Sequence, residues 1–298
     1  ELVIDADADA DAAVLLALMR QSPLAKQHGN TLRTLSAGGP ASVDFALRLP
    51  MWQEGALAQI DGTVALDGAR LGETEWNIAF ANVRGTGRFD QDGFDAEGLR
   101  AVYDRQEGAL SLRAGPTHVR DARNGFEAEL EASMTTDDLI ARTGERMAWL
   151  KPHLRGRSRW TAAITIPAGA ATPTRLTALQ LRSDLVGTAL DLPAPMDKPA
   201  GTALPTRVDI ALPLGKGEIG VALGQRLAVR VREADGQTGI RAAFGADRVA
   251  EAPPASGLVL TGSTPMLDAL PWITLLRGDG KGASLPLRRI DVRTDRLV

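Results

Sequence analysis

Apolar and polar residues alternate in short segments along most of the chain, most clearly between residues 176 and 214. There Leu179 and Leu181 alternate with polar residues, a turn follows at Ser183-Asp184, and Leu190 belongs to a second segment. A loop rich in proline and glycine leads to a third segment, whose apolar positions are Val208, Ile210 and Leu212. A period of two residues is typical of strands with one apolar and one solvated face. This region therefore predicts strand, turn, strand, long loop and strand.

The same alternation recurs on both sides of this region, separated by turns such as Asp67-Gly68 and Asp92-Gly93 that are typical of hairpins. Before it, the apolar positions include Val43, Phe45, Leu47, Leu49, Ile60, Val64, Leu66, Trp76, Ile78, Phe80, Leu110, Leu112, Phe126, Leu130, Trp160, Ile164 and Ile166. After it, they include Val221, Leu223, Leu227, Val229, Val231, Leu258 and Leu260. We count about 16 to 18 candidate strands and predict an antiparallel meander.

Three stretches have a helical pattern instead. The first covers residues 10–20, restarts after Ser22-Pro23, includes Leu35 and ends at Gly38. We interpret the acidic residues before it as a helix N-terminus, where carboxylates meet the positive end of the dipole: Asp5, Asp7 and Asp9. The second stretch covers about residues 139–154, with a cap at 135–138 and a break near Gly144. The third covers about 266–276 and opens at Pro265.

A helix followed by several strands recurs about every 120 residues. The segment 35–50 has the same design as 154–167, and a looser third copy begins at Leu276. We therefore predict a first helix-plus-strands repeat at residues 1–134, a second at 135–264 and the start of a third at 265–298. Because the pattern is cut at both ends, we expect the sequence to be a fragment of a longer protein.

Composition excludes several classes of function. The net charge is -3, so no basic field is available to recruit nucleic acid. The chain has no cysteine, which removes thiolate nucleophiles and cysteine metal sites from consideration. The longest apolar run, residues 12–19, is far shorter than the roughly 20 residues that span a bilayer.

Residues with catalytic or metal-binding chemistry do not form a recognisable motif. The histidines are His28, His118 and His153, and none has a second ligand at a metal-binding spacing, so we interpret them as surface or turn residues. The segment 90–95 resembles the start of a calcium loop, but Ala101 stands where an EF-hand needs a carboxylate. A hairpin turn explains this segment better. We expect no catalytic residue, no metal site and no cofactor.

Three helical stretches cannot cover both faces of so many strands, so the apolar face must find another partner. The sheet could fold face to face into a sandwich whose apolar residues fill an ordinary core. It could instead curl into a trough whose apolar floor accepts a ligand. Alternating strands usually build cores, so the pattern alone favours the sandwich.

A family resemblance changes that preference. The run SDLVGTALDLPAPMDKPAGTALPTRVDIALPL, residues 183–214, resembles the YhdP-type branch of the AsmA-like proteins. The helix containing Ser22-Pro23-Leu24, the segment 41–50 and the segment 257–272 resemble the same family. The similarity extends over nearly the whole sequence, and the run 183–214 is its most specific part.

This resemblance implies an envelope protein related to TamB and to bridge-like lipid-transfer proteins, whose repeated β-units stack into an elongated groove. It implies a mainly β fold, an elongated and curled antiparallel sheet with a few short helices. It also implies phospholipid movement through the periplasm from inner to outer membrane, and anchoring by an N-terminal membrane helix outside this sequence. The implied partners are phospholipid acyl chains, the inner membrane and outer-membrane or envelope proteins. The family supplies no catalytic residues, so we expect no enzyme.

The floor of such a groove should consist of the inward-facing apolar residues of the alternating segments. The candidates are Val43, Phe45, Leu47, Leu49, Trp76, Ile78, Phe80, Ile164, Ile166, Leu190, Val208, Ile210, Leu212, Val229 and Val231. The alternative function is a structural or adhesive β-sandwich repeat of a secreted array, with no ligand groove.

Overall fold

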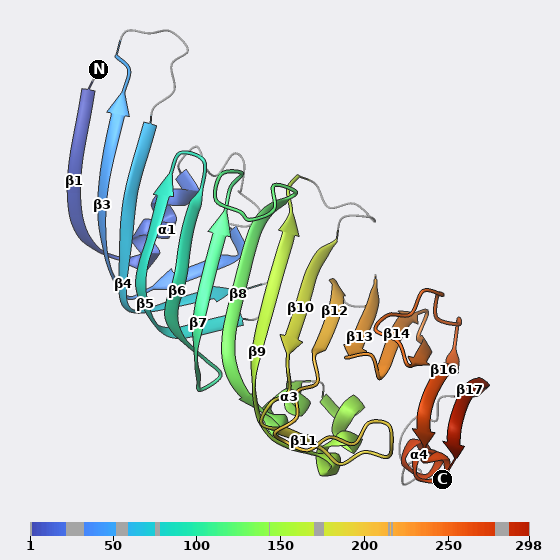
Figure 1. Cartoon of the computed structure of the whole chain (residues 1–298). Coiled ribbons are helices and arrows are strands. Elements are labelled where there is room, and N and C mark those ends of the chain that lie inside the picture. Colours follow the sequence, from blue (N-terminus) through green and yellow to red (C-terminus); the bar gives the residue numbers. More distant parts are fainter. Residues whose placement is uncertain are drawn as a thin grey trace. The chain divides into compact units, whose positions relative to one another are not determined.

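A computed structural model describes residues 2–21, 33–51, 59–74, 78–142, 144–169, 176–213, 215, 217–277 and 286–297. These residues are mainly β, and their 17 strands form one open sheet with a few short helices (Figure 1). The strand count and the fold class agree with the sequence prediction. The predicted helix restart at Ser22-Pro23 and the candidate Trp76 lie outside the described residues.

The chain divides into two compact units, and the first contains residues Glu1–Ala132 and Ala163–Arg175. Its antiparallel strands pair in the order β1, β3, β4, β5, β6, β7 and β8, and β2 pairs with the second half of β4. The strands are β1 (Leu2–Asp11), β2 (Leu35–Gly38), β3 (Pro40–Leu49), β4 (Gln59–Glu73), β5 (Ile78–Asp90), β6 (Phe94–Tyr103), β7 (Gln106–Ala114) and β8 (Asn124–Thr135). Helix α1 (Ala12–Gln21) follows β1.

The second unit contains residues Ser133–Ala162 and Leu176–Val298. Its helices are α3 (Thr136–Arg142), the 3-10 helix η1 (Gly144–His153) and α4 (Ala269–Arg277). The remaining strands are β9 (Leu154–Pro167), β10 (Thr177–Ser183), β11 (Thr188–Leu190), β12 (Thr206–Leu212), β13 (Glu218–Leu223), β14 (Leu227–Ala234), β15 (Gln237–Phe244), β16 (Gly257–Leu267) and β17 (Leu287–Leu297). The order β10, β11, long loop, β12 is the one predicted for residues 176–214.

Not every pair of strands is antiparallel. β10, β12, β13, β14 and β15 pair antiparallel in that order, but β15 with β16 and β16 with β17 are parallel. A parallel pair needs a crossover connection that returns the chain to the end of the sheet at which the first strand began. Residues 245–256 make the first such connection, and the second contains α4. The division into compact units does not test the predicted repeat boundaries at 134 and 264, which remain a prediction.

The interpretation of the first aspartates as a helix N-terminus is wrong. Asp5, Asp7 and Asp9 lie in β1, which pairs with β3 over its whole length. Aspartate and alanine have low strand propensity, but their period of two and the ladder to β3 determine the structure here. Only Asp11 caps α1, through a 2.8 Å hydrogen bond from the backbone N–H of Ala13. Leu35, predicted in a helix, lies in β2.

The other helix predictions are closer to the structure. Thr135 caps α3 by accepting a hydrogen bond from the backbone N–H of Asp138, and the helical stretch changes to 3-10 geometry at Gly144. The third helix begins later than predicted, because Pro265 and Met266 extend β16. The hairpin predicted at residues 90–95 joins β5 to β6.

The packed core of the first unit lies where β4, β5 and β6 are irregular. The ladder register shifts around Asp67–Leu71, Ala81–Gly87 and Ala96–Leu99, and bulges of this kind bend a strand. Val83, Leu99 and Leu110 are at most 1% exposed there. A Cβ on Gly85 would lie 2.8 Å from a methyl of Leu99, so glycine allows this close packing.

In the second unit, the core forms around the long loop between β11 and β12. Met134, Trp160, Leu185, Leu190 and Leu204 form one buried cluster. The loop is therefore packed into the unit although it has little regular structure.

Candidate functional site

One face of the sheet is apolar in each unit, because neighbouring strands pair in a register that aligns their apolar residues. Residues paired across a ladder point to the same face. In the second unit, one row is Leu179, Ile210, Ile219, Val231, Ile240 and Leu258. The next row is Leu181, Val208, Val221, Val229, Ala242 and Leu260.

The first unit has rows of the same kind. One is Ala6, Phe45, Gly62, Phe89, Phe94, Ala114 and Phe126. The next is Ala8, Val43, Val64, Gly87, Ala96, Leu112 and Ala128. We call the surface formed by such rows the apolar face and the opposite surface the polar face. Single strands of the sequence predict the alternation, but only the register aligns it across strands.

Most of the predicted floor residues are half-buried and therefore neither fully packed nor fully solvated. This group is Phe45, Leu47, Leu49, Ile78, Phe80, Ile164, Ile166, Val208, Ile210, Leu212, Val229 and Val231. Val43 is 8% exposed between its ladder partners Ala8 and Val64, and Leu190 is 7% exposed within the cluster around the β11–β12 loop. Phe80 packs against the core of the first unit, with its ring centroid 5.4 Å from that of Tyr103.

Helix α1 packs on the apolar face, which the sequence analysis did not anticipate. Its Ala12 is buried with Ala41 and Ala69, next to Val64 and Leu66. The opposite side of the helix leaves two apolar residues uncovered, Val14 at 54% and Leu18 at 59% exposure. Their spacing of four residues is the signal that could have identified this second apolar stripe.

The polar face carries charged residues along the matching rows. In the first unit, one row is Asp7, Asp44, Thr63, Arg88, Asp95, Arg113 and Glu127. In the second, one row is Gln180, Asp209, Gly220, Arg230 and Arg241. A hollow beside β1, β3 and β4 is lined by carboxylates of Asp5, Asp7, Asp44 and Asp61, so it does not suit a hydrocarbon chain.

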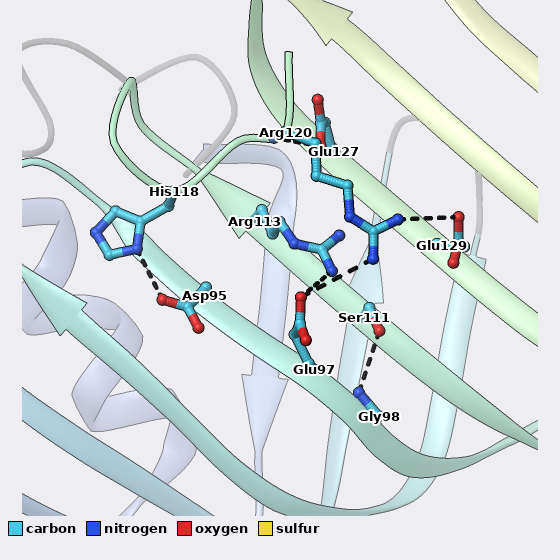
Figure 2. A network of polar contacts seen from close by, with 9 residues as sticks. All are labelled: Asp95, Glu97, Gly98, Ser111, Arg113, His118, Arg120, Glu127 and Glu129. Atoms are coloured by element: carbon cyan, nitrogen blue, oxygen red, sulfur yellow. Dashed lines mark hydrogen bonds and ion pairs between the residues drawn. The ribbon is translucent and has the colours of Figure 1, made fainter. Parts of the chain in front are cut away.

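A network of ion pairs covers part of the polar face (Figure 2). The Arg113 side chain is 4% exposed and pairs with Glu97, which also lies 3.9 Å from Arg120. The Arg113 guanidinium holds the pKa of the Glu97 carboxyl below its ordinary value. His118 lies in a loop as predicted, but its side chain is largely buried between Asp90 and Asp95. The spacing of these residues in the sequence gave no sign of this contact.

Two kinds of feature are absent from the described residues, a metal-binding cluster and a membrane-spanning helix. Among them, no group of three or more His, Cys, Asp or Glu side chains is placed to hold a metal ion. No helix in the described parts of the chain has both the length and the apolar character needed to cross a membrane.

Comparison with known proteins agrees with the resemblance found in the sequence. The family model described as YhdP protein matches residues 1–298. No match was found among curated proteins or among solved structures. Because the family match covers the whole sequence, the chain belongs to the YhdP family of AsmA-like proteins.

Proposed function

We propose that this chain is a segment of a lipid-transfer conduit that shields phospholipid acyl chains between the inner and outer membranes. The observation that supports this most directly is the alignment of mostly half-buried apolar residues across neighbouring strands of the second unit. A packed core would bury such rows, whereas a surface that carries hydrocarbon must leave them partly accessible. Membership of the YhdP family supports the same proposal.

The physical task of such a conduit requires binding and no bond-making chemistry. Each methylene exposed to water costs about 0.8 kcal/mol, so a 16-carbon chain costs roughly 12 kcal/mol to move bare through water. A continuous apolar face lowers this barrier by replacing water with aliphatic side chains. The charged polar face keeps the opposite side of the sheet solvated.

The proposal includes the location and the partners of the protein. The conduit would lie in the periplasm, anchored in the inner membrane by a helix outside this sequence. Outer-membrane or envelope proteins would receive the lipid. The adhesive β-sandwich is less well supported, because all strands of the described residues belong to one sheet, and a sandwich needs a second.

Adjacent residues of β13 provide a matched test. Val221 points to the apolar face between Val208 and Val229, whereas Ala222 points to the polar face beside Arg207. Both are half-buried. We expect Val221→Asp to reduce co-purifying phospholipid at least about tenfold, because a carboxylate in the apolar row must be desolvated by a bound chain. Ala222→Asp should retain lipid. Mass spectrometry of gently purified protein measures both.

Thermal unfolding of the same variants separates binding from folding. If the apolar face is a binding surface, Val221→Asp folds with a melting temperature close to that of Ala222→Asp. If Val221→Asp unfolds the second unit, the row is a packed core and the conduit proposal fails. Wild-type protein that carries no phospholipid would also contradict it.

A further inference from the structure

The loop that joins β7 to β8, residues 115–123, is held by several contacts, and two of them lie at opposite sides of the loop (Figure 2). At the first, the Glu127 carboxylate accepts the backbone N–H groups of Arg120 at 2.9 Å and Asp121 at 3.0 Å. It also accepts the side-chain amide of Asn124 at 2.8 Å. At the second, His118 reaches the hairpin between β5 and β6.

Two glycines allow the loop to approach the hairpin closely. A Cβ on Gly93 would lie 1.9 Å from the carbonyl oxygen of Ala114, and one on Gly115 would lie 2.1 Å from that of Asp92. The hairpin turn and the start of the loop are therefore in direct backbone contact. This contact places His118 within reach of two carboxylates.

The imidazole of His118 lies between these carboxylates. Its Nδ1 forms a 2.8 Å hydrogen bond with Oδ1 of Asp95, whereas its Nε2 lies 3.1 Å from Oδ1 of Asp90 at ion-pair distance, without hydrogen-bond geometry. The His118 side chain is 12% exposed, against 30% for Asp90 and 35% for Asp95. Only the imidazolium carries an N–H at both nitrogens. In the neutral form, one nitrogen lone pair would face a carboxylate oxygen.

Among the described ion pairs, His118 is the cation that contacts both carboxylates. Oδ1 of Asp90 also accepts the backbone N–H groups of Asp92 at 2.8 Å and Gly93 at 3.0 Å, which fix its position. The other charged groups nearby compensate one another: Arg113 pairs with Glu97, and Arg120 lies between Glu97 and Glu129. Arg88 and Arg113 also flank Asp95 on the neighbouring strands, and His118 is the cation in ion-pair contact with both Asp90 and Asp95.

The proton equilibrium follows from this geometry. Burial alone would lower the pKa of His118, but the hydrogen bonds and negative charges of Asp90 and Asp95 outweigh burial and raise it above its ordinary value. A raised pKa stabilises the folded contact fully below the ordinary value, and this stabilisation is lost as the pH rises through the raised value. Burial opposes ionisation of Asp90, yet His118 and the turn N–H groups lower its pKa, so this partner is lost only at acidic pH.

We propose that His118 is a proton-operated clasp on the polar face. As the imidazolium it holds the 115–123 loop against the β5–β6 hairpin. When it loses its proton, this side of the loop is released while Glu127 keeps the other side in place. The device thus converts a rise in pH through the His118 midpoint into local opening without unfolding the sheet.

The test combines two measurements on the full chain. NMR titration of the histidine ring signals should place the His118 midpoint above its ordinary value of about 6.5. Hydrogen exchange of residues 115–123, corrected for the intrinsic pH dependence, should accelerate at least about fivefold across the same midpoint. Exchange in β7 and β8 should not change. A His118 midpoint at or below the ordinary value would overturn the proposal. So would a loop exchange rate that does not change across the His118 midpoint.

Variants assign the effect to this contact. His118→Gln should give fast loop exchange at every pH between 6 and 9. Asp95→Asn should move the His118 midpoint and the loop opening together to lower pH, and it decides the question if His118→Gln fails to fold. His153→Gln is the control, because His153 lies in η1 with its Nδ1 2.9 Å from the carbonyl oxygen of Asp191. A pH-dependent opening that survives in His118→Gln would also exclude the clasp.

Discussion

Lys198 organises the long loop between β11 and β12 although it is only 2% exposed. Its Nζ donates to the carbonyl oxygens of Thr188 at 2.6 Å and Pro199 at 3.0 Å. Burial and then the nearby Arg226 guanidinium lower the pKa of Lys198. The buried ammonium is stabilised by these two carbonyl oxygens, of which that of Pro199 also accepts the backbone N–H of Thr202 at 3.1 Å.

Replacing Lys198 by alanine should lower the free energy of unfolding by roughly 1–3 kcal/mol, because it removes the ammonium donor to the Thr188 carbonyl oxygen and the packed stem. Chemical denaturation of the second unit measures the change. Lys151→Ala is the matched control: its side chain is 66% exposed and lies 3.7 Å from Asp137, so it should change stability by less than about 0.5 kcal/mol. Equal effects of the two variants would show that the buried contacts of Lys198 contribute nothing.

Helix α1 is apolar on both of its sides, which is unusual for a helix at a surface. One side covers Ala41 and Val64 on the apolar face, and the other presents Val14 and Leu18. Under the proposed function, this outer stripe extends the surface available to acyl chains. The helix therefore both closes part of the apolar face and supplies new apolar area beside it.

Two valines of similar exposure test this role. Val14→Asp should weaken binding of a fluorescent phospholipid about tenfold, equivalent to ~1.4 kcal/mol, because the charge would face the bound chain. Val3→Asp should leave binding unchanged. Val3 is 49% exposed and pairs with Arg48 on the polar face, so it controls for adding a charge to an exposed valine. If both variants bind the lipid as wild type does, α1 lies outside the binding surface.

The elements that the sequence predicted correctly are those in which apolar and polar residues alternate without interruption. Leu179, Leu181, Val208 and Ile210 alternate without interruption, so their strands could be predicted from their own residues. The strand containing Asp5, Asp7 and Asp9 could not, because only the ladder to β3 opposes the capping preference of aspartate. The alignment of apolar rows and the contact of His118 with Asp95 depend on register and on loop approach, which no local pattern encodes.

At the scale of the whole molecule, each unit has its own packed core, and part of each core lies on the apolar face, where Leu112 and Leu181 pack against it. The first unit has its core around Leu99 and Leu110, and the second has its core around Trp160 and Leu204. The half-buried rows of the apolar face contribute less to these clusters. Under the proposed function, the half-buried positions of the face, such as Val208 and Val229, are the ones available to a ligand, whereas Leu99 and Leu110 stabilise the fold.

Each unit should accordingly lose stability by itself. Leu110→Ala removes a side chain that is 1% exposed, and we expect it to lower the free energy of opening of β6 and β7 by about 2–5 kcal/mol. Hydrogen exchange resolved by segment measures this loss, and β12 to β15 should retain wild-type protection. Leu204→Ala, at a position that is 3% exposed in the second unit, should give the reverse pattern. Equal loss of protection in both units from either variant would mean that the sheet unfolds as one cooperative structure, and the independent stability of the two units would then be excluded.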